Sequence, residues 1–339
     1  MTSSPLLSVF IPAYDAARYV REAVESVLDN GFTDLEVIVV DDGSTDGTAE
    51  IVESISHPAL RLFRNATNLG VAATRQRSAD LSRGRHVAFL DADDVAVPGR
   101  FAAQVDRLET ASGPDIVGGA VENFGDFVLT KPCYASDAEI KAALLFNSPV
   151  SQGAACMKLA PLREGRIRYS PELGSAEDYA LWVDAMLIGL RMENLDRVVI
   201  RYRRHAASMT YARIDEMLQC ACRVRKRVVD AYFPAFTEAE RIAIVNAIAG
   251  GFDTLQLWCE EIYALSRAAL AAADVPGVDS ALMVRLLSER ALSSIKDAIK
   301  RGAVSADTLE MMTESNAYFE RWRAADNGAL DQNIMALFY

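Results

Sequence analysis

Acidic side chains gather at two points where an apolar run of the sequence ends. Asp41-Asp42-Gly43-Ser44 follows one such run, and Asp91-Ala92-Asp93-Asp94 follows another. The second cluster places three carboxylates within four residues, and these repel one another unless a cation or hydrogen-bond donors neutralise them. It therefore predicts a divalent-cation site, and carboxylate oxygens suit Mn²⁺ or Mg²⁺, which commonly bridge to the phosphates of a substrate.

The first cluster has two interpretations. Aspartate, glycine and serine favour tight turns, so Asp41–Ser44 can simply cap a turn into the next helix. At the end of a strand that lies near the other acidic cluster, the same residues can instead contact a ligand. The residues alone leave both interpretations open.

Two further elements carry candidate chemistry. Glu177-Asp178 precedes the helical run Leu181–Leu190, where the carboxylates either do chemistry or only interact favourably with the helix dipole. Arg201-Tyr202-Arg203-Arg204-His205, followed by Ser208 and Thr210, gathers cations and hydroxyls that can hold a diphosphate. The alternative for this second element is a solvated basic edge strand.

Short β-branched runs alternate with amphipathic stretches from residue 6 to about residue 121, and these elements must position the acidic clusters. The pattern predicts an α/β fold with an open, doubly wound, mainly parallel sheet. The expected strands are Ser8–Ile11, Leu35–Asp41, Leu60–Arg64, His86–Leu90 and Ile116–Val121. The expected helices lie near Tyr19–Leu28, Gly47–Ile55, Val71–Leu81 and Pro98–Thr110, with Asp15 and Asp46 as N-caps. Ligands of such a sheet bind at the carboxyl ends of its strands.

The pattern changes along the chain and predicts two domains. Residues 1–212 form the α/β domain, with a ligand-binding half to about residue 121 and a less regular half from 122 to 212. Residues 213–339 are almost entirely helical, with apolar spacings such as Val284, Leu287, Ala291, Ile295 and Ala298. The basic run from Arg223 to Arg227 is either a solvated helix face or a contact for an anionic membrane surface or a polyanion.

Composition excludes several classes of protein. The 339 residues carry a formal net charge of −12, whereas a nucleic-acid binder needs a basic surface. Pro12 breaks the first apolar run, Leu6–Ile11, so we expect a strand there rather than a signal peptide or a membrane anchor. Five cysteines, scattered and odd in number, indicate free thiols in a reducing compartment, and hence a cytoplasmic protein.

Taken together, these residues resemble the family 2 glycosyltransferases of the GT-A type over about residues 7–210. The features follow in the family's order: Ser8–Tyr14, Val39–Asp46, Asn68-Leu69-Gly70 with Arg75, Phe89–Asp94, Glu177-Asp178 and the Arg203/His205 region. The chain departs from the family pattern at Asp15 and Gln76, where asparagine is usual. The resemblance implies a GT-A (Rossmann-like) fold with an all-helical C-terminal appendage, and an inverting, metal-dependent glycosyltransferase.

The resemblance also implies roles for individual residues. A nucleotide-sugar donor, with uridine as the favoured base, would contact Pro12, Ala13, Tyr14, Asp41, Arg75, Asp91, Ala92, Asp94 and Arg203. Asp93 and Asp91 would hold Mn²⁺ or Mg²⁺, with His205 as a further ligand or a diphosphate contact. Asp178 would be the general base, and Glu177 would orient the loop or contact acceptor hydroxyls. The chemistry agrees, because a fixed cation stabilises the charge that builds on a leaving diphosphate.

The partners follow from the same resemblance. We expect a growing polysaccharide or a glycolipid-linked glycan as the acceptor, and an enzyme in the cytoplasm or peripheral on the inner face of the membrane. The apolar helix faces favour packing against the first domain or a second subunit, so a homo-oligomer is expected.

Two other functions compete. A nucleotidyltransferase that makes an activated sugar would need a Gly-rich loop, and Ser8–Tyr14 contains no glycine. A catalytically silent nucleotide-sugar-binding scaffold would have no use for Glu177-Asp178.

Overall fold

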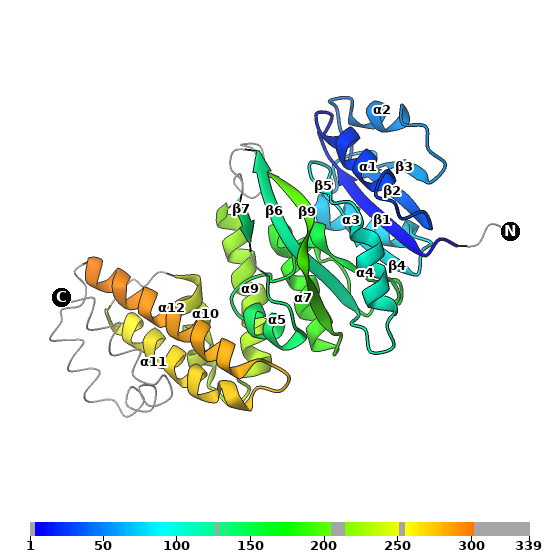
Figure 1. Cartoon of the computed structure of the whole chain (residues 1–339). Helices are drawn as coiled ribbons and strands as arrows, with labels where there is room; N and C mark the ends of the chain where they lie inside the picture. Colours follow the sequence, from blue (N-terminus) through cyan, green and yellow to red (C-terminus); the bar gives the residue numbers. More distant parts are fainter. Residues whose placement is uncertain (1–3, 126–128, 132, 205–213, 251–254, 302–339) are drawn as a thin grey trace. The chain divides into compact units, whose positions relative to one another are not determined.

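The computed structural model describes residues 4–125, 129–131, 133–204, 214–250 and 255–301 (Figure 1). These residues group into two compact units. The first unit comprises the described residues up to Ile140 and those from Ser148 to Ala221. The second comprises Lys141–Asn147 and the described residues from Cys222 onward. The boundary predicted between residues 212 and 213 lies outside the described residues.

The first unit contains a sheet and the helices that cover it. Its strands are β1 (Leu7–Ala13), β2 (Leu35–Asp41), β3 (Leu60–Arg64), β4 (His86–Phe89), β5 (Val95–Ala96), β6 (Ile116–Gly125), β7 (Leu129–Lys131), β8 (Cys156–Lys158) and β9 (Met192–Arg204). Its helices are α1 (Val20–Leu28), α2 (Thr48–Glu53), α3 (Val71–Leu81), α4 (Arg100–Glu109), α6 (Ala160–Arg163) and α7 (Glu177–Leu187), with short 3-10 helices η1 (Gln152–Ala154) and η2 (Pro171–Ala176).

This sheet contains both parallel and antiparallel pairs of strands. The described strands lie in the order β3-β2-β1-β4-β8-β6-β9-β5, and β7 pairs with β6. The pairs β1–β2, β2–β3, β1–β4 and β6–β9 are parallel. Strand β8 is antiparallel to both β4 and β6, so β6 runs in the same direction as β4.

The expected α/β fold with a mainly parallel sheet is confirmed, with one correction to the order of its strands. The sequence pattern predicts the strand near Ile116–Val121 as a direct member of the parallel set, but β8 lies between it and β4. Strand β8 lies in the less regular half of the first domain, residues 122–212. It has only three residues, too few to show the alternating hydrophobic pattern of a strand. A pairing of this kind depends on contacts distant in sequence, which a local pattern does not encode.

Burial explains why β1 and β2 form at the centre of the unit. All seven residues of β2 are buried, and six of the seven in β1 are, as expected for strands with helices on both faces. The adjacent α1 buries Val20, Ala23, Val24 and Val27 at helical spacing.

The two predicted helix N-caps are wrong. Tyr19 is the N-cap of α1 and Gly47 that of α2. Asp15 has a positive φ of 45° and accepts a hydrogen bond from the main-chain nitrogen of Thr45 instead. The Asp46 carboxylate accepts a hydrogen bond from the main-chain nitrogen of Ala17, in the segment before α1, at 2.9 Å.

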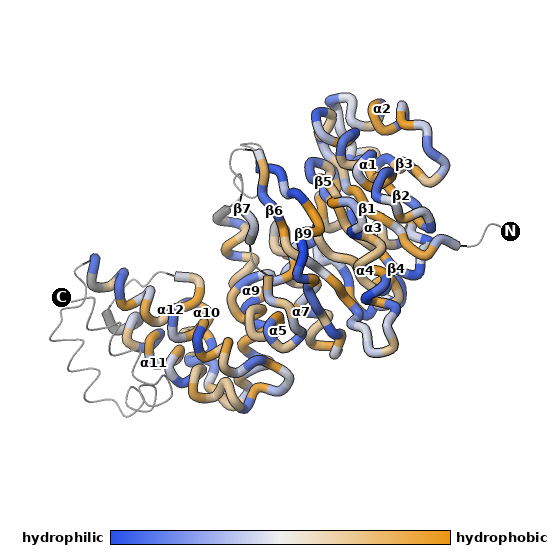
Figure 2. Tube along the Cα trace, in the orientation of Figure 1, coloured by the Kyte–Doolittle hydropathy of each residue, from blue (hydrophilic) through white to orange (hydrophobic). Residues whose placement is uncertain are grey.

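The second unit is helical, as the sequence predicts. Its described helices are α10 (Glu238–Ala249), α11 (Leu255–Ala271), η3 (Ala272–Asp274) and α12 (Ser280–Lys300), while α5 (Asp137–Leu144) and α9 (Ile214–Tyr232) have residues in both units. In Figure 2 these helices alternate between hydrophobic and hydrophilic colours along their length. Of the predicted apolar spacing, Leu287, Ala291, Ile295 and Ala298 are fully buried.

The basic run of α9 is not an open cationic face. Arg225 is buried and donates hydrogen bonds to the carbonyls of Leu145 and Phe146. Lys226 forms ion pairs with Asp230 and Glu238. Contact of this run with a membrane surface stays a prediction. Arg225 and Lys226 do not favour it, because both already have partners within the protein. Among the described residues, no helix is both long and apolar enough to cross a membrane.

Candidate functional site

The second acidic cluster forms a tight loop directly after β4. The main-chain nitrogen of Asp94 donates a hydrogen bond to the carbonyl of Asp91 at 3.1 Å, which folds the loop back on itself. Ala92 and Asp94 are buried, whereas Asp91 and Asp93 are half-buried. Burial, together with the charges of Asp91 and Asp93, holds the pKa of Asp94 well above its usual range.

Arg203 fastens this loop to β9. Its main-chain nitrogen donates to Asp94 Oδ1 at 2.9 Å, and its Nε donates to the carbonyl of Asp93 at 2.8 Å. The guanidinium lies over the rings of Tyr19 and Phe124, at 4.8 and 4.4 Å from their centroids. Strand β5 pairs with β9 only at Ile200 and Arg201, and beyond them β9 pairs, among the described strands, with β6 alone. Arg203 nevertheless contacts the acidic loop and is not simply solvated as the edge-strand interpretation expects. His205, Ser208 and Thr210 lie outside the described residues.

Arg75 joins the acidic loop to the start of α7. The guanidinium is 7% exposed, its Nη2 lies 2.7 Å from Asp91 Oδ1, and its Nη1 is paired with Glu177. The structure thus brings together residues from α3, the end of β4 and the first turn of α7. In this arrangement both amino groups of Arg75 are held by carboxylates, so a direct contact of Arg75 with a donor stays a prediction.

Glu177 and Asp178 are the first two residues of α7, so this helix begins earlier than the helical run Leu181–Leu190 that the sequence indicates. Asp178 Oδ1 accepts a hydrogen bond from the main-chain nitrogen of Tyr179 at 2.6 Å, and Oδ2 accepts one from Ser148 Oγ at 3.4 Å. Burial raises the pKa of Asp178, and Arg75 opposes this effect. Burial likewise raises the pKa of Glu177, to about 7. Groups with pKa values raised in this way are suited to accept protons near neutral pH.

The first acidic cluster serves partly as a turn. Asp42 accepts hydrogen bonds from the main-chain nitrogens of Leu69 and Gly70, both at 2.9 Å, so its role is structural. Asp41 is buried and pairs in register with Ala13 across β1 and β2. The residues expected at the nucleobase therefore lie side by side: Pro12, Ala13 and Asp41, with the exposed Tyr14 following them.

The acidic loop fits a divalent cation whose coordination is completed by substrate. Asp94 Oδ2 is buried and has no hydrogen-bond partner among the described residues, so the loop contains a carboxyl oxygen that its surroundings leave unsatisfied. No group of three or more His, Cys, Asp or Glu side chains is arranged to hold a metal within the described part of the chain. Two half-buried carboxylates plus phosphate and water oxygens are the usual donor set of Mg²⁺.

Several residues at the site escape prediction from the sequence. Gln152 Nε2 donates to the hydroxyl of Tyr169 at 2.6 Å, and both side chains are buried. Next to Gln152, a Cβ added to Gly153 would lie 3.5 Å from one carboxylate oxygen each of Asp91 and Asp94. Gln152 and Gly153 belong to the short 3-10 helix η1, and Tyr169 lies outside helices and strands, so no hydrophobic period marks these residues as functional.

The sequence pattern also does not identify Arg100 and Gln104, which lie on α4. Arg100 is fully buried and donates to the carbonyls of Phe89 and Ala155. Its Nε donates to Gln104 Oε1 at 2.9 Å. The sole local signal is their i, i+4 spacing on an amphipathic helix.

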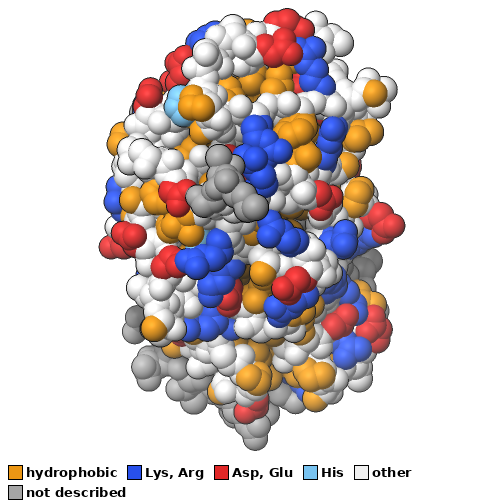
Figure 3. All heavy atoms as spheres, turned by 90° about the vertical axis from the view of Figure 1, so that its right-hand side faces the viewer, with side chains coloured by type: hydrophobic (Ala, Val, Ile, Leu, Met, Phe, Trp, Pro, Cys, Tyr) orange, Lys and Arg blue, Asp and Glu red, His pale blue; other side chains and the backbone are white. Residues whose placement is uncertain are grey.

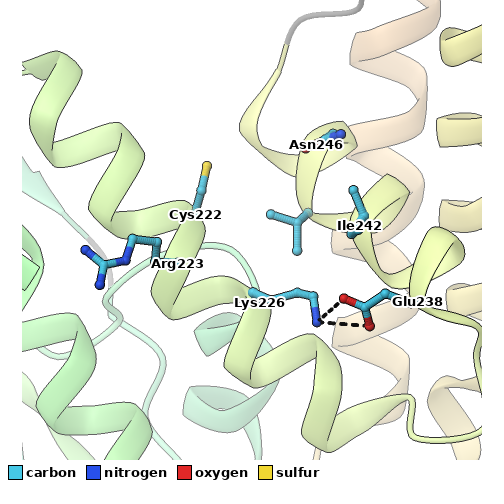
Figure 4. Close-up of a pocket in the computed structure, with 7 residues that line it drawn as sticks. Cys222, Arg223, Lys226, Glu238, Ile242 and Asn246 are labelled. Carbon is cyan, nitrogen blue, oxygen red and sulfur yellow. Dashed lines mark hydrogen bonds and ion pairs between the residues drawn. The ribbon is translucent and has the colours of Figure 1, made fainter.

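A hollow of about 390 Å³ lies between α9 and α10 of the second unit (Figure 4). Its lining residues are Cys222, Arg223, Lys226, Glu238, Ile242, Val245 and Asn246. In Figure 4 the Lys226 amine points to the Glu238 carboxylate, so this cation is already neutralised. The hollow contains none of the residues predicted for the site.

Basic and acidic side chains are interspersed on the face drawn in Figure 3, with Lys and Arg gathered across its middle. The net charge of −12 is therefore not spread as a uniform negative surface over this face.

Comparisons with known proteins agree with this geometry. Residues 8–153 match the family model described as glycosyl transferase family 2. An Escherichia coli protein, the UDP-Glc:alpha-D-GlcNAc-diphosphoundecaprenol beta-1,3-glucosyltransferase WfaP, is 30% identical over 217 residues, which cover 63% of this chain and 83% of the relative. An uncharacterized glycosyltransferase of Haemophilus influenzae is 26% identical over 249 residues, covering 68% of this chain and 76% of the relative.

The fold has solved counterparts as well. A crystal structure of S. aureus TarS superposes with a TM-score of 0.57 at 21% identity and covers 87% of this chain and 91% of that one. A second TarS structure, in complex with UDP-GlcNAc, gives a TM-score of 0.58. These likenesses confirm the expected GT-A-like fold. With the sequence match and the acidic loop after β4, they place this chain in glycosyl transferase family 2.

Proposed function

We propose that the protein is an inverting glycosyltransferase that moves a sugar from a nucleotide diphosphate donor, with a UDP-sugar favoured, to a hydroxyl of a polysaccharide or glycolipid-type acceptor. The observation that carries this proposal is the meeting of Asp91, Arg75 and the Glu177-Asp178 pair at one end of the sheet. The name of the E. coli relative, which specifies UDP-Glc and a diphosphoundecaprenol acceptor, supports the choice of donor and acceptor class.

The donor would lie across the carboxyl ends of β1, β2 and β4. Pro12, Ala13 and Asp41 are adjacent there, and they would contact the nucleobase. Asp91 and Asp93 would hold Mn²⁺ or Mg²⁺, which supplies a positive charge beside the diphosphate when it is bound. Asp94 and Arg203, joined to each other at 2.9 Å, would keep that loop in position.

Asp178 would act as the general base. As the acceptor oxygen attacks the anomeric carbon, its proton moves to Asp178 and the electrons of the breaking bond move onto the diphosphate oxygen. Attack from the face opposite the leaving group inverts the anomeric carbon. The hydrogen bonds from Tyr179 and Ser148 hold the carboxylate in place, and its raised pKa makes it a better proton acceptor than a free aspartate.

The donor half of the proposal is tested by a thermal-shift panel of nucleotides and nucleotide sugars, each with and without Mn²⁺. We expect UDP with Mn²⁺ to raise the melting temperature, because a ligand that binds only the folded state stabilises it. The Asp93→Ala variant should lose the dependence on Mn²⁺. The catalytic half is tested by the slow hydrolysis of the best-binding nucleotide sugar. Equal inertness of the wild type and Asp93→Ala across the donor panel would contradict an enzymatic role and favour a silent binding protein.

We propose that the enzyme works in the cytoplasm or peripherally on the inner face of the membrane, because its acceptor would be carried by a lipid. Assembly into a homo-oligomer is a further proposal, and light scattering of the purified protein tests it.

A further inference from the structure

Arg75 is a buried cation shared between two carboxylates that belong to different parts of the predicted reaction. Asp91 is on the donor side and lies 2.7 Å from Nη2, while Glu177 is on the base side and is paired with Nη1. The three side chains come from α3, the loop after β4 and the start of α7. Glu177 is the residue directly before Asp178, so any force on Glu177 acts on the helical turn that carries the base.

The charges around Arg75 do not balance. One guanidinium faces Asp91 and Glu177 directly and interacts electrostatically with Asp178 as well. Carboxylates in excess of cations compete for the cation, and a buried carboxylate such as that of Glu177 is costly without a partner. If a ligand neutralises the carboxylate of Asp91, Arg75 interacts more strongly with the remaining carboxylates.

We propose that Arg75 is a positioning residue that couples occupation of the donor site to the placement of Asp178. This inference rests on the proposed function. When the donor and its cation engage Asp91, Arg75 interacts mainly with Glu177 and holds the first turn of α7 more tightly. The base is then in place when the donor is bound, and less firmly held when it is absent.

Hydrogen exchange followed by mass spectrometry tests the coupling without an acceptor. The probe is UDP with Mn²⁺, compared with UDP alone and Mn²⁺ alone. In the wild type we expect UDP with Mn²⁺ to slow exchange at least about tenfold both in the acidic loop, residues 89–95, and at the start of α7, residues 176–183. In Arg75→Met, at concentrations of UDP and Mn²⁺ that saturate this variant, the protection of the acidic loop should remain, while that of α7 should be lost.

Two further variants complete the test. Glu177→Gln removes the other end of the link and should lose the protection of α7 in the same way. Arg77→Met is the matched control, because Arg77 lies on the same helix but bonds to the carbonyl of Arg64 and to Asn65; it should behave as the wild type. The melting temperature of each variant without ligand shows whether the variant is folded. If Arg75→Met is not folded, Glu177→Gln alone tests the coupling.

The outcomes separate the coupling from the proposed function. If UDP with Mn²⁺ protects neither segment of the wild type, the donor site itself is wrong. If it protects the acidic loop but not α7 in the wild type, or protects α7 equally in Arg75→Met and Glu177→Gln, the donor site stands and the coupling through Arg75 is overturned.

Discussion

The main-chain nitrogen of Arg203 donates a hydrogen bond to Asp94 across a separation of 109 residues. The Nε of the same arginine donates to the carbonyl of Asp93. One residue of β9 thereby supports the loop that is expected to hold the donor and its cation. The loop is short and half-buried, so its geometry depends on this support.

Replacing Arg203 with methionine should weaken donor binding. The substitution removes the hydrogen bond from Nε to the carbonyl of Asp93 and keeps the main-chain bond to Asp94. Loss of a charge-assisted hydrogen bond costs about 1.5–3 kcal/mol, and 1.4 kcal/mol is about tenfold in affinity. We therefore expect KM for the nucleotide sugar to rise at least about tenfold, with a smaller change in kcat. Arg201→Met is the matched control, because Arg201 lies on the same strand but pairs with Glu122. Equal KM values for the two variants would contradict a role of Arg203 at the donor loop.

Replacing Asp178 with asparagine should remove catalysis and spare donor binding. General-base catalysis contributes about 10²–10⁴ to the rate, so kcat for transfer to an acceptor should fall by about that factor. The thermal shift caused by UDP and Mn²⁺ should be unchanged. Asp184→Asn, on the same helix, is the control. Full transfer activity in Asp178→Asn would assign the base to another residue.

The pH dependence of the reaction should report the environment of Asp178. A base works in its deprotonated form, so activity is retained above its pKa and is lost as the pH falls through it. Because burial raises this pKa from the ordinary value of 3.8, the acid limb of kcat/KM should lie at a higher pH than for a free aspartate. A profile of kcat/KM from about pH 3 upward measures it, and a limb at about pH 3.9 or below would argue that another group is titrating.

Replacing Gln104 with leucine should destabilise the first unit. Gln104 Nε2 donates to the carbonyls of Ala154 at 2.7 Å and Val117 at 2.9 Å, and its Oε1 accepts from Arg100. Leaving such buried groups without partners costs about 1–3 kcal/mol each, so the free energy of unfolding should fall by about 2–5 kcal/mol.

Urea unfolding of the Gln104→Leu variant measures this loss. Asp106→Ala is the control, because Asp106 is exposed on the same helix and should change the free energy of unfolding by less than about 0.5 kcal/mol. A similarly small change in Gln104→Leu would show that the carbonyls find other partners.

The sequence by itself determined the local elements and the chemistry that they carry. The predicted strands Leu35–Asp41 and Leu60–Arg64 match β2 and β3, and the predicted helix Val71–Leu81 matches α3. These elements are readable because their periods of hydrophobic residues are local properties of the chain. The position of Asp91–Asp94 at the end of an apolar strand was readable for the same reason.

Tertiary structure decided how these elements meet. The insertion of β8 between β4 and β6, the support of Asp94 by Arg203 and the pairing of Arg75 with both Asp91 and Glu177 all join residues from distant parts of the chain. Such contacts carry no local period, because burial and charge select the partner only when the sheet has brought the elements together. The sequence therefore identifies the carboxylates and the two arginines, while only the fold shows that Arg75 pairs with Asp91 and Glu177 and that Arg203 holds the acidic loop.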